Sequence, residues 1–329
     1  MAVITNTFRS TSAVGNREKL SDVVSRIDPE DTPIYSMIPK ESIDGTHPEW
    51  ETETLATPGA NAQEEGSDYS FDAITPPSRM GNYTQIFDKK WIISNTQESV
   101  DDAGRVQKMK HQKLKKGIEL RKDVEYSIVA NTASVAGNTR YSGSLPSWLT
   151  TNVSRNSGSN GGFNSGTGLT VAETTGTQRA FTKTLVDTVA QSCYVNGGNV
   201  KSLVVSPYVK SVFVTFMSDS NVASFRYAAS DGSGNSIVAN ADVYEGPFGK
   251  LMVMPNRVMA VAAATARRAF FLDTEMISWI WLRKIQSVND LAKTGDAEKG
   301  AIVGEGCLKV KNEKGLGVIA DLYGLTSGS

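Results

Sequence analysis

The stretch from residue 47 to residue 77, HPEWETETLATPGANAQEEGSDYSFDAITPP, sets the strongest limit on how this chain can fold. It contains seven acidic residues, no lysine and no arginine, and its middle has no sustained apolar period. A segment of this composition has too little apolar surface to bury itself. Unstructured connections longer than about 12–15 residues are uncommon in compact domains, and most are either functional or disordered. The stretch is therefore predicted to be a long loop with a function, or a disordered linker.

The rest of the chain has the composition of a folded protein. Its length of 329 residues suggests about two domains, and with 39% hydrophobic and 21% charged residues a real core is expected. The net charge of −1 excludes a global attraction to nucleic acid or membrane, so any such attraction must come from local patches. Two cysteines, Cys193 and Cys307, exclude a disulfide scaffold and fit a reducing compartment. Because neither a signal peptide nor an apolar run long enough for a membrane helix is evident, a cytoplasmic setting is expected.

A long helix is the clearest local prediction. Residues 105–131 lack proline and repeat apolar side chains at helical spacing, which predicts a rod of about 40 Å. The repeated positions are Val106, Met109, Leu114, Ile118, Val124 and Ile128. Residues 83–94, rich in aromatic and β-branched side chains, predict a strand just before it. Shorter helices are expected at residues 16–27 and 33–38, in an extended N-terminal arm.

The second half of the chain predicts mixed helices and strands. Residues 137–177 and 225–240 are polar and glycine-rich, as in loops. Thr182 and the Ser206–Pro207 pair stand where helix caps are expected, before apolar residues on one helical face. The last sixty or so residues predict antiparallel strands by their alternation. In residues 277–282 both sets of alternating positions are largely apolar, as in a strand between two layers.

Motifs that would indicate an enzyme are incomplete. His47-Pro48-Glu49 matches half of a zinc deaminase signature, but no Pro-Cys-x-x-Cys completes it. Gly315-x-Gly317-x-x-Ala320 matches a dinucleotide fingerprint, yet it lies too near the C-terminus for the helix and strand that the motif needs, so a glycine-rich turn is favoured. Cys193 is expected to be a small core residue. A carboxylate pair is left open because acids are plentiful. We predict no catalytic residue, no metal site and no cofactor.

Charge is segregated along the chain. From Glu41 to Asp72 there are nine acidic and no basic residues, whereas Arg105 to Asp123 holds eight basic and two acidic residues. The two runs can be independently solvated surfaces, which is the usual case. Alternatively, the acidic loop lies on the basic helix, either its own or that of another copy. The candidate side chains for this pairing are Glu64, Glu65 and Asp68 on the loop and Lys113, Lys115 and Lys116 on the helix.

The order of these features resembles a known class of structural proteins. An arm, an extended loop, a strand leading into a long helix, an α/β segment and a return into strands is the order in tailed-phage major capsid proteins of the HK97 type. Local residues are similar to the branch of that group named after the SU10 major capsid protein. They include residues 31–38 (DTPIYSMI), 50–56 (WETETLA), 65–66 (EG), 79–86 (RMGNYTQI) and 243–257 (VYEGPFGKLMVMPNR).

The resemblance implies an α+β, HK97-type capsid fold with five parts. These are an N-terminal arm (1–45), an extended loop (46–85), a peripheral domain with its spine helix at 105–131 (86–177), an axial domain (178–264) and a return of peripheral β strands (265–329). It also implies that arm and loop reach over neighbouring subunits. Trp50, Phe71 and Ile74 are then the candidate apolar anchors of the loop. For Trp50, packing in the core of its own subunit is an equally open alternative.

The function implied is that of a major capsid protein. It would self-assemble through pentamers and hexamers into an icosahedral shell around phage double-stranded DNA, assembled in the host cytoplasm. Expected partners are further copies of the chain, a portal, a separate scaffolding protein, possible decoration proteins, and DNA through weak non-specific contact, with no membrane. An encapsulin-like cargo cage and a carboxylate-dependent hydrolase are the alternatives. No lysine lies between Glu41 and Asp88, so the Lys–Asn isopeptide cross-link of some such capsids is not expected.

Overall fold

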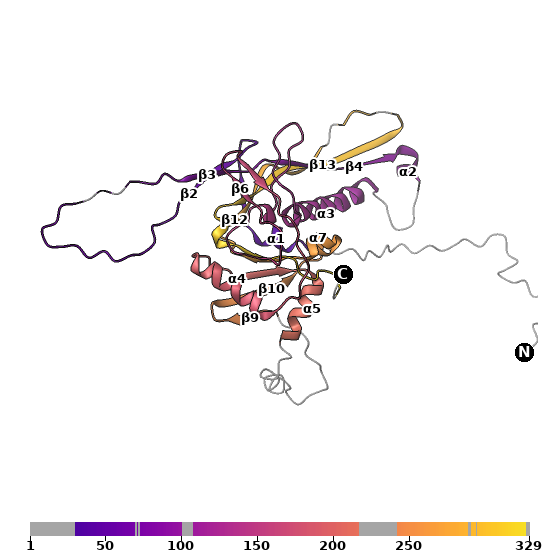
Figure 1. Cartoon of the computed structure of the whole chain (residues 1–329). Helices are drawn as coiled ribbons and strands as arrows, with labels where there is room; N and C mark the ends of the chain where they lie inside the picture. The colour runs from indigo at the N-terminus through magenta and orange to yellow at the C-terminus, as the bar shows by residue number, and fades with distance from the viewer. Residues whose placement is uncertain are drawn as a thin grey trace, which may run out of the picture.

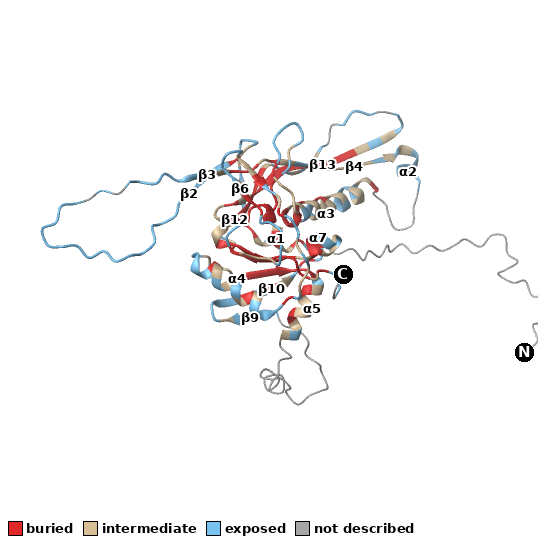
Figure 2. Cartoon of the chain, viewed as in Figure 1, coloured by how far each residue is buried: buried red, intermediate tan, exposed pale blue. Residues whose placement is uncertain are grey.

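The computed structural model describes residues 30–69, 71, 73–100, 108–216, 242–288, 291–293 and 295–326. Two β-sheets with their helices form the body, and a long loop projects from one side of it (Figure 1). Burial is concentrated in the sheets and in the helix faces that contact them (Figure 2). The predicted helix at 16–27 and the predicted loop at 225–240 lie outside the described residues.

The first sheet has four strands in the order β1-β12-β13-β4. They are β1 (Lys40–Ser42), β4 (Gln85–Ser94), β12 (Ile277–Val288) and β13 (Ala297–Val310). β13 pairs antiparallel with both β12 and β4, and β1 joins the edge of β12 in parallel. All five residues from Ile277 to Trp281 are buried, which confirms the prediction of a strand covered on both faces.

The predicted long helix is α3 (Lys108–Val129), which packs across β4 and β13. Its C-terminal half carries the wholly buried side chains of Leu120, Val124 and Ile128, one turn apart. Its N-terminal half is different, because Leu114, on the predicted apolar face, is 71% exposed. Residues 105–107 of the predicted range lie outside the described residues, and the helix ends at Val129 rather than Asn131.

The second sheet has six strands in the order β5-β14-β11-β8-β10-β9. They are β5 (Val153–Ser154), β8 (Ser202–Val205), β9 (Val243–Gly246), β10 (Gly249–Pro255), β11 (Ala269–Leu272) and β14 (Gly317–Ile319). Helices α4 (Lys183–Val195) and α5 (Pro207–Thr215) contribute buried residues to the same core. As predicted, Ser206 caps α5, since its Oγ accepts a hydrogen bond from the amide of Val209 at 3.3 Å.

β11 and β14 belong to the range expected to return as peripheral strands, yet both pair in this second sheet. All four residues of β11 and all three residues of β14 are buried, so each strand needs a neighbouring strand on both sides. A short, uniformly apolar run predicts a buried strand but not which sheet it joins. The sequence pattern alone could not have placed them.

The remaining elements are short. Two further strand pairs are β2 (Glu49–Thr52) with β3 (Ser78–Gly81) and β6 (Gly162–Asn164) with β7 (Leu169–Val171). Short helices are α1 (Pro33–Met37), α2 (Asn95–Ser99) and α7 (Ala263–Ala266), and single 3₁₀ turns are η2 (Leu145–Ser147), η4 (Val258–Val261) and η5 (Glu313–Gly315). η5 leads into β14, so the Gly315–Gly317 motif is a turn that opens a strand, as expected.

Candidate intersubunit surfaces

The extended loop is anchored by a short antiparallel pair of strands. β2 and β3 align Glu49 with Gly81 and Thr52 with Ser78, and Arg79 forms an ion pair with Glu49 across them. From this base the loop runs far out from the body and returns (Figure 1). The only backbone hydrogen bond within its described part joins Ser67 N to Glu64 O at 3.2 Å. The loop is therefore held at its base alone.

Trp50 packs at this base against its own chain. Its indole Nε1 donates a hydrogen bond to the carbonyl of Val310 at 2.9 Å, and its ring lies 5.5 Å from that of Trp148. Lys309 lies over the same ring, 5.9 Å from its centre. Of the two alternatives for Trp50, this geometry is that of a residue of its own subunit's core.

The apolar side chains farther along the loop are uncovered. Four of them are between 91% and 97% exposed: Leu55, Tyr69, Phe71 and Ile74. The described residues of the projection beyond its paired strands are drawn as exposed in Figure 2. Isolated exposed apolar residues are ordinary, but several on one projection indicate an interaction surface. Phe71 and Ile74 thus have the exposure that an anchor for a partner needs.

The acidic loop and the basic helix do not meet within one chain. α3 runs to the side of the body away from the loop (Figure 1). Glu64, Glu65 and Asp68 are exposed, and so are Lys113 and Lys115. Lys116 differs, because its Nζ donates to Glu119 on the next turn at 2.7 Å. Pairing between copies stays a prediction for these side chains.

A buried carboxylate fastens the exit of the loop to the first sheet. Glu305 on β13 is 3% exposed and accepts hydrogen bonds from Thr84 Oγ1 at 2.9 Å, Arg140 Nη2 at 2.7 Å and Arg283 Nη2 at 2.9 Å. Burial acts to raise the pKa of Glu305, but the hydrogen bonds from Thr84, Arg140 and Arg283 outweigh it and hold the pKa below its ordinary value. No local sequence pattern marks Glu305, because its partners Thr84 and Arg140 are 221 and 165 positions away along the chain.

A second buried carboxylate holds α1, in the described part of the N-terminal arm. Glu125 on α3 is wholly buried, and it accepts hydrogen bonds from the first amides of α1, Ile34 N at 3.0 Å and Tyr35 N at 2.7 Å. Asn256, just after β10, donates to it at 2.6 Å. Burial raises the pKa of Glu125, and these three donors act in the opposite direction. The sequence signal for this site is the position of Glu125 beside Val124 in the predicted helix, where a carboxylate needs buried hydrogen-bond donors.

Among the described residues, no site with catalytic geometry emerges. Burial raises the pKa of the Cys193 thiol to about 12, which fits the expected core residue rather than a nucleophile. His47 stacks on Tyr83 at 4.1 Å, and in the described part of the chain no three His, Cys, Asp or Glu side chains gather as metal ligands would. No helix among these residues is long and apolar enough to cross a membrane.

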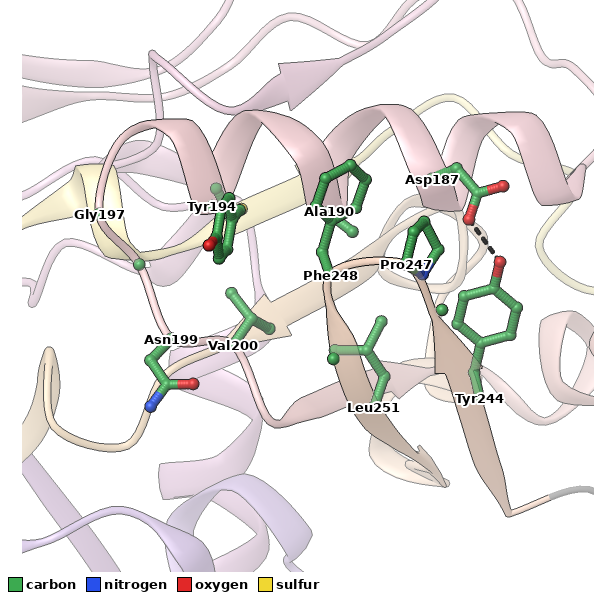
Figure 3. A pocket seen from close by; sticks show the side chains of 14 residues that line it. Asp187, Ala190, Tyr194, Gly197, Asn199, Val200, Tyr244, Pro247, Phe248 and Leu251 are labelled. Carbon is green, nitrogen blue, oxygen red and sulfur yellow. Dashed lines mark hydrogen bonds between the residues drawn. The ribbon is translucent and has the colours of Figure 1, made fainter.

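A cavity lies in the second sheet's layer, between α4 and the β9–β10 hairpin (Figure 3). It has a volume of about 270 Å³ and an apolar lining that includes Ala190, Val200 and Leu251. Tyr244 on β9 donates a hydrogen bond to Asp187 of α4 at its rim. Neither Tyr244 nor Asp187 is hydrogen-bonded to a candidate nucleophile in the described part of the chain. The cavity therefore resembles a packing gap between the hairpin and the helix.

Comparison with known proteins identifies the family. The sequence model of the SU10 major capsid protein family matches residues 3–323. This chain belongs to the SU10 major capsid protein family. Its function is therefore that of a phage major capsid protein, as the sequence resemblance implied. The chain is also similar to the major capsid protein of Escherichia phage Phieco32, with 34% identity over 127 residues. That stretch covers 38% of this chain and 36% of the relative, so the chain matches about a third of the relative's length.

Solved structures show the same fold at low sequence identity. The SU10-family chain is similar to a chain of the cyanophage A-1(L) capsid asymmetric unit, with a TM-score of 0.65, 11% identity and coverage of 97% of this chain and 100% of the other. It is also similar to a chain of the capsid of the native GTA particle, with a TM-score of 0.62, 11% identity and coverage of 95% and 97%. The predicted α+β, HK97-type capsid fold is confirmed.

Proposed function

We propose that this capsid protein assembles through hexamers and pentamers into an icosahedral shell around double-stranded DNA, in which the extended loop of each copy is completed by a neighbour. The observation that carries this proposal is the loop with its four nearly wholly exposed apolar side chains, Leu55, Tyr69, Phe71 and Ile74. Ordering such a segment costs about 1–2 kcal/mol per residue in backbone entropy. Contacts within the described chain do not offset that cost, so contacts between copies must do so.

Ring closure follows from the kind of interface that a projecting loop makes. A loop on one copy that seats on a different surface of the next is a heterologous contact, and such contacts close into rings when the rotation between copies permits. Each contact can be of ordinary size, about 800 Å² per partner. Many contacts per copy then make the shell collectively stable.

The proposal also assigns the domains. The peripheral domain is formed by residues 86–177 and 265–329 and the axial domain by residues 178–264, with β11 and β14 crossing into the axial sheet.

Further partners follow from the same proposal. A shell of this kind needs a portal for DNA entry and a scaffolding protein during assembly in the host cytoplasm, and it can carry decoration proteins. The net charge of −1 supports only weak, non-specific contact with DNA.

The test of the proposed shell function is expression of the full chain, followed by size-exclusion chromatography and negative-stain microscopy. Rings or closed particles are expected; a monodisperse monomer at high concentration, with scaffolding protein present, would overturn the proposal. Closed particles that hold protein cargo rather than DNA would favour the cage alternative.

A further inference from the structure

An open apolar groove lies where the C-terminal half of α3 meets η4. It has a volume of about 320 Å³, and the side chains of Tyr126, Val258 and Val261 form its apolar lining. Val258 is buried, whereas Tyr126 is 40% exposed and Val261 is 74% exposed. Asp31, the second described residue of the chain, also lines the groove. An apolar surface thus stands open beside the first described residues of the N-terminal arm.

The arm is fixed beside this groove. Asp31 forms an ion pair with Arg257, the residue before η4, at 3.8 Å. Both side chains are well exposed, so the pair adds little stability, but it places residue 31 at the groove. Just after it, the first two amides of α1 donate to the buried Glu125. α1 then leads away, because Tyr35 and Lys40 line a different groove, between α3 and β12. The part of the chain that precedes Asp31 therefore begins at the groove of Tyr126 and Val261.

The sequence just before Asp31 carries an apolar face that needs a partner. Residues 16–27 repeat apolar side chains at helical spacing, at Leu20, Val23, Val24 and Ile27. A helix of this length is marginal in water alone and takes most of its stability from packing that face. Pro29 ends the helical pattern, and only residues 28–30 separate it from Asp31. Even fully extended, this link keeps Ile27 within roughly 14 Å of Asp31.

We propose that residues 16–27 form a helix whose apolar face seats in this groove of the same chain. The short link decides for the chain's own segment, because it holds the helix near the groove at an effective concentration of about a millimolar or more. A helix from another copy has no such advantage in the unassembled subunit. Docked in this way, the segment covers Tyr126 and Val261 and fixes the place from which residues 1–15 leave the subunit.

The lining of the groove suits an apolar helix face rather than a charged ligand. Its two cations, Lys122 and Arg257, are balanced by two carboxylates, Asp31 and Asp123, so the lining has no net formal charge. Asp123 is in addition paired with Lys89 of β4 at 2.6 Å. A nucleic acid, whose non-specific contacts depend on cations, gains little from such a surface. Recognition is left to the apolar side chains, which the adjoining segment supplies.

Disulfide formation within one chain tests the proposal directly. The double variant Val24→Cys/Val261→Cys places one thiol on the apolar face of the segment and the other on the groove, and both native cysteines are buried. In the dilute, unassembled full chain, oxidation with diamide should join the two new thiols. The bond is measured as the loss of two maleimide-reactive thiols per chain, at a rate independent of protein concentration.

The matched control is Ser25→Cys/Val261→Cys. It keeps the same link to Asp31 but places the thiol on the opposite side of the predicted helix, and its disulfide should form at least tenfold more slowly. Equal rates for the two double variants would overturn the proposal. Disulfide-linked dimers between the single variants Val24→Cys and Val261→Cys, formed in preference to the bond within one chain, would assign the groove to the arm of another copy instead. Because the unassembled subunit is measured, neither outcome depends on the shell function.

Limited digestion with trypsin provides an independent measurement. The segment contains three cleavage positions, Arg17, Lys19 and Arg26, which a docked helix protects. Val261→Asp should raise the rate of cleavage there at least tenfold. The control Val195→Asp changes a valine of α4 that is 75% exposed, close to the 74% of Val261, and it should change the rate less than twofold. Equal cleavage rates for the two variants would contradict the proposal.

Discussion

Replacing Glu305 by glutamine should destabilise the subunit in a pH-dependent way. The carboxylate receives hydrogen bonds from Thr84, Arg140 and Arg283, with donor–acceptor distances between 2.7 and 3.1 Å. Glutamine keeps one acceptor oxygen and turns a donor group toward a guanidinium. A hydrogen bond to a charged group contributes about 1.5–3 kcal/mol when buried.

The size of the effect follows from how exposed the partners are. The Glu305 side chain is 5% exposed, the Arg140 side chain 23% and the Arg283 side chain 48%. In the variant, water can replace part of the hydrogen bonding that Arg283 loses, so the Arg283–Glu305 pair contributes less to the expected change than the Arg140–Glu305 pair. The expected loss in the free energy of unfolding at pH 7 is about 2–3 kcal/mol. With an m value of about 3 kcal/mol per M urea, the unfolding midpoint of the unassembled subunit should fall by roughly 0.7–1 M.

The pH dependence has a definite sign. The pKa of Glu305 is held below its ordinary value in the folded chain, because the hydrogen bonds outweigh burial. A carboxyl group of this kind stabilises the fold above its unfolded-state pKa of about 4.3, and this contribution is lost as the pH falls through the lower folded-state pKa. The difference between native protein and Glu305→Gln should thus persist from pH 7 to about pH 5 and shrink below about pH 4.

Urea unfolding followed by tryptophan fluorescence, at a series of pH values, measures this difference. Glu298→Gln is the matched control, since Glu298 lies on the same strand and is exposed. Its midpoint should stay within about 0.2 M of the native one, in keeping with ordinary surface substitutions. An equal shift for the two variants, or a Glu305→Gln shift that is the same at pH 7 and pH 3.5, would refute the reasoning.

Three further outcomes are expected. Glu125→Ala leaves the backbone amides of Ile34 and Tyr35 and the side-chain amide of Asn256 without their acceptor. It should lower the free energy of unfolding by roughly 3 kcal/mol or more and speed cleavage by protease near residue 33. The control Glu119→Ala, on the same helix, should do neither. Trp50→Phe removes the hydrogen bond to Val310 and should lower the unfolding free energy by about 1 kcal/mol; an unchanged thermal midpoint would show that the contact contributes nothing. Mature shells should migrate as single chains on a denaturing gel, because no lysine lies between Glu41 and Asp88, and a ladder of covalent oligomers would contradict this.

Local structure was predictable wherever short-range patterns decide it. The helical period of residues 105–131 placed α3, and the Ser206–Pro207 pair placed the start of α5. The stretch from Ile277 to Trp281, apolar except for Ser278, predicted a strand between layers, and it is buried throughout. These signals need only neighbours within a few positions, which is why they are visible without a structure.

The candidate site was predictable in part. The acidic composition of residues 47–77 predicted a long loop that cannot bury itself, and its apolar side chains Leu55, Tyr69, Phe71 and Ile74 are nearly wholly exposed. The same composition could not separate Trp50 from Phe71 and Ile74. Trp50 lies on β2 and meets the carbonyl of a residue 260 positions away, whereas the other two lie beyond the paired strands.

By itself the sequence determined which segments can bury themselves and which cannot, because that depends on composition and on periods of two or of about three and a half residues. Only the tertiary structure decided which sheet receives β11 and β14, and which donors gather around Glu125 and Glu305, 91 and 221 positions from partners such as Ile34 and Thr84. It also decided that the N-terminal half of α3 is left open beside β12, with cations around an apolar floor. Hydrogen bonds and packing act over a few ångströms in space, and their range along the chain has no such limit.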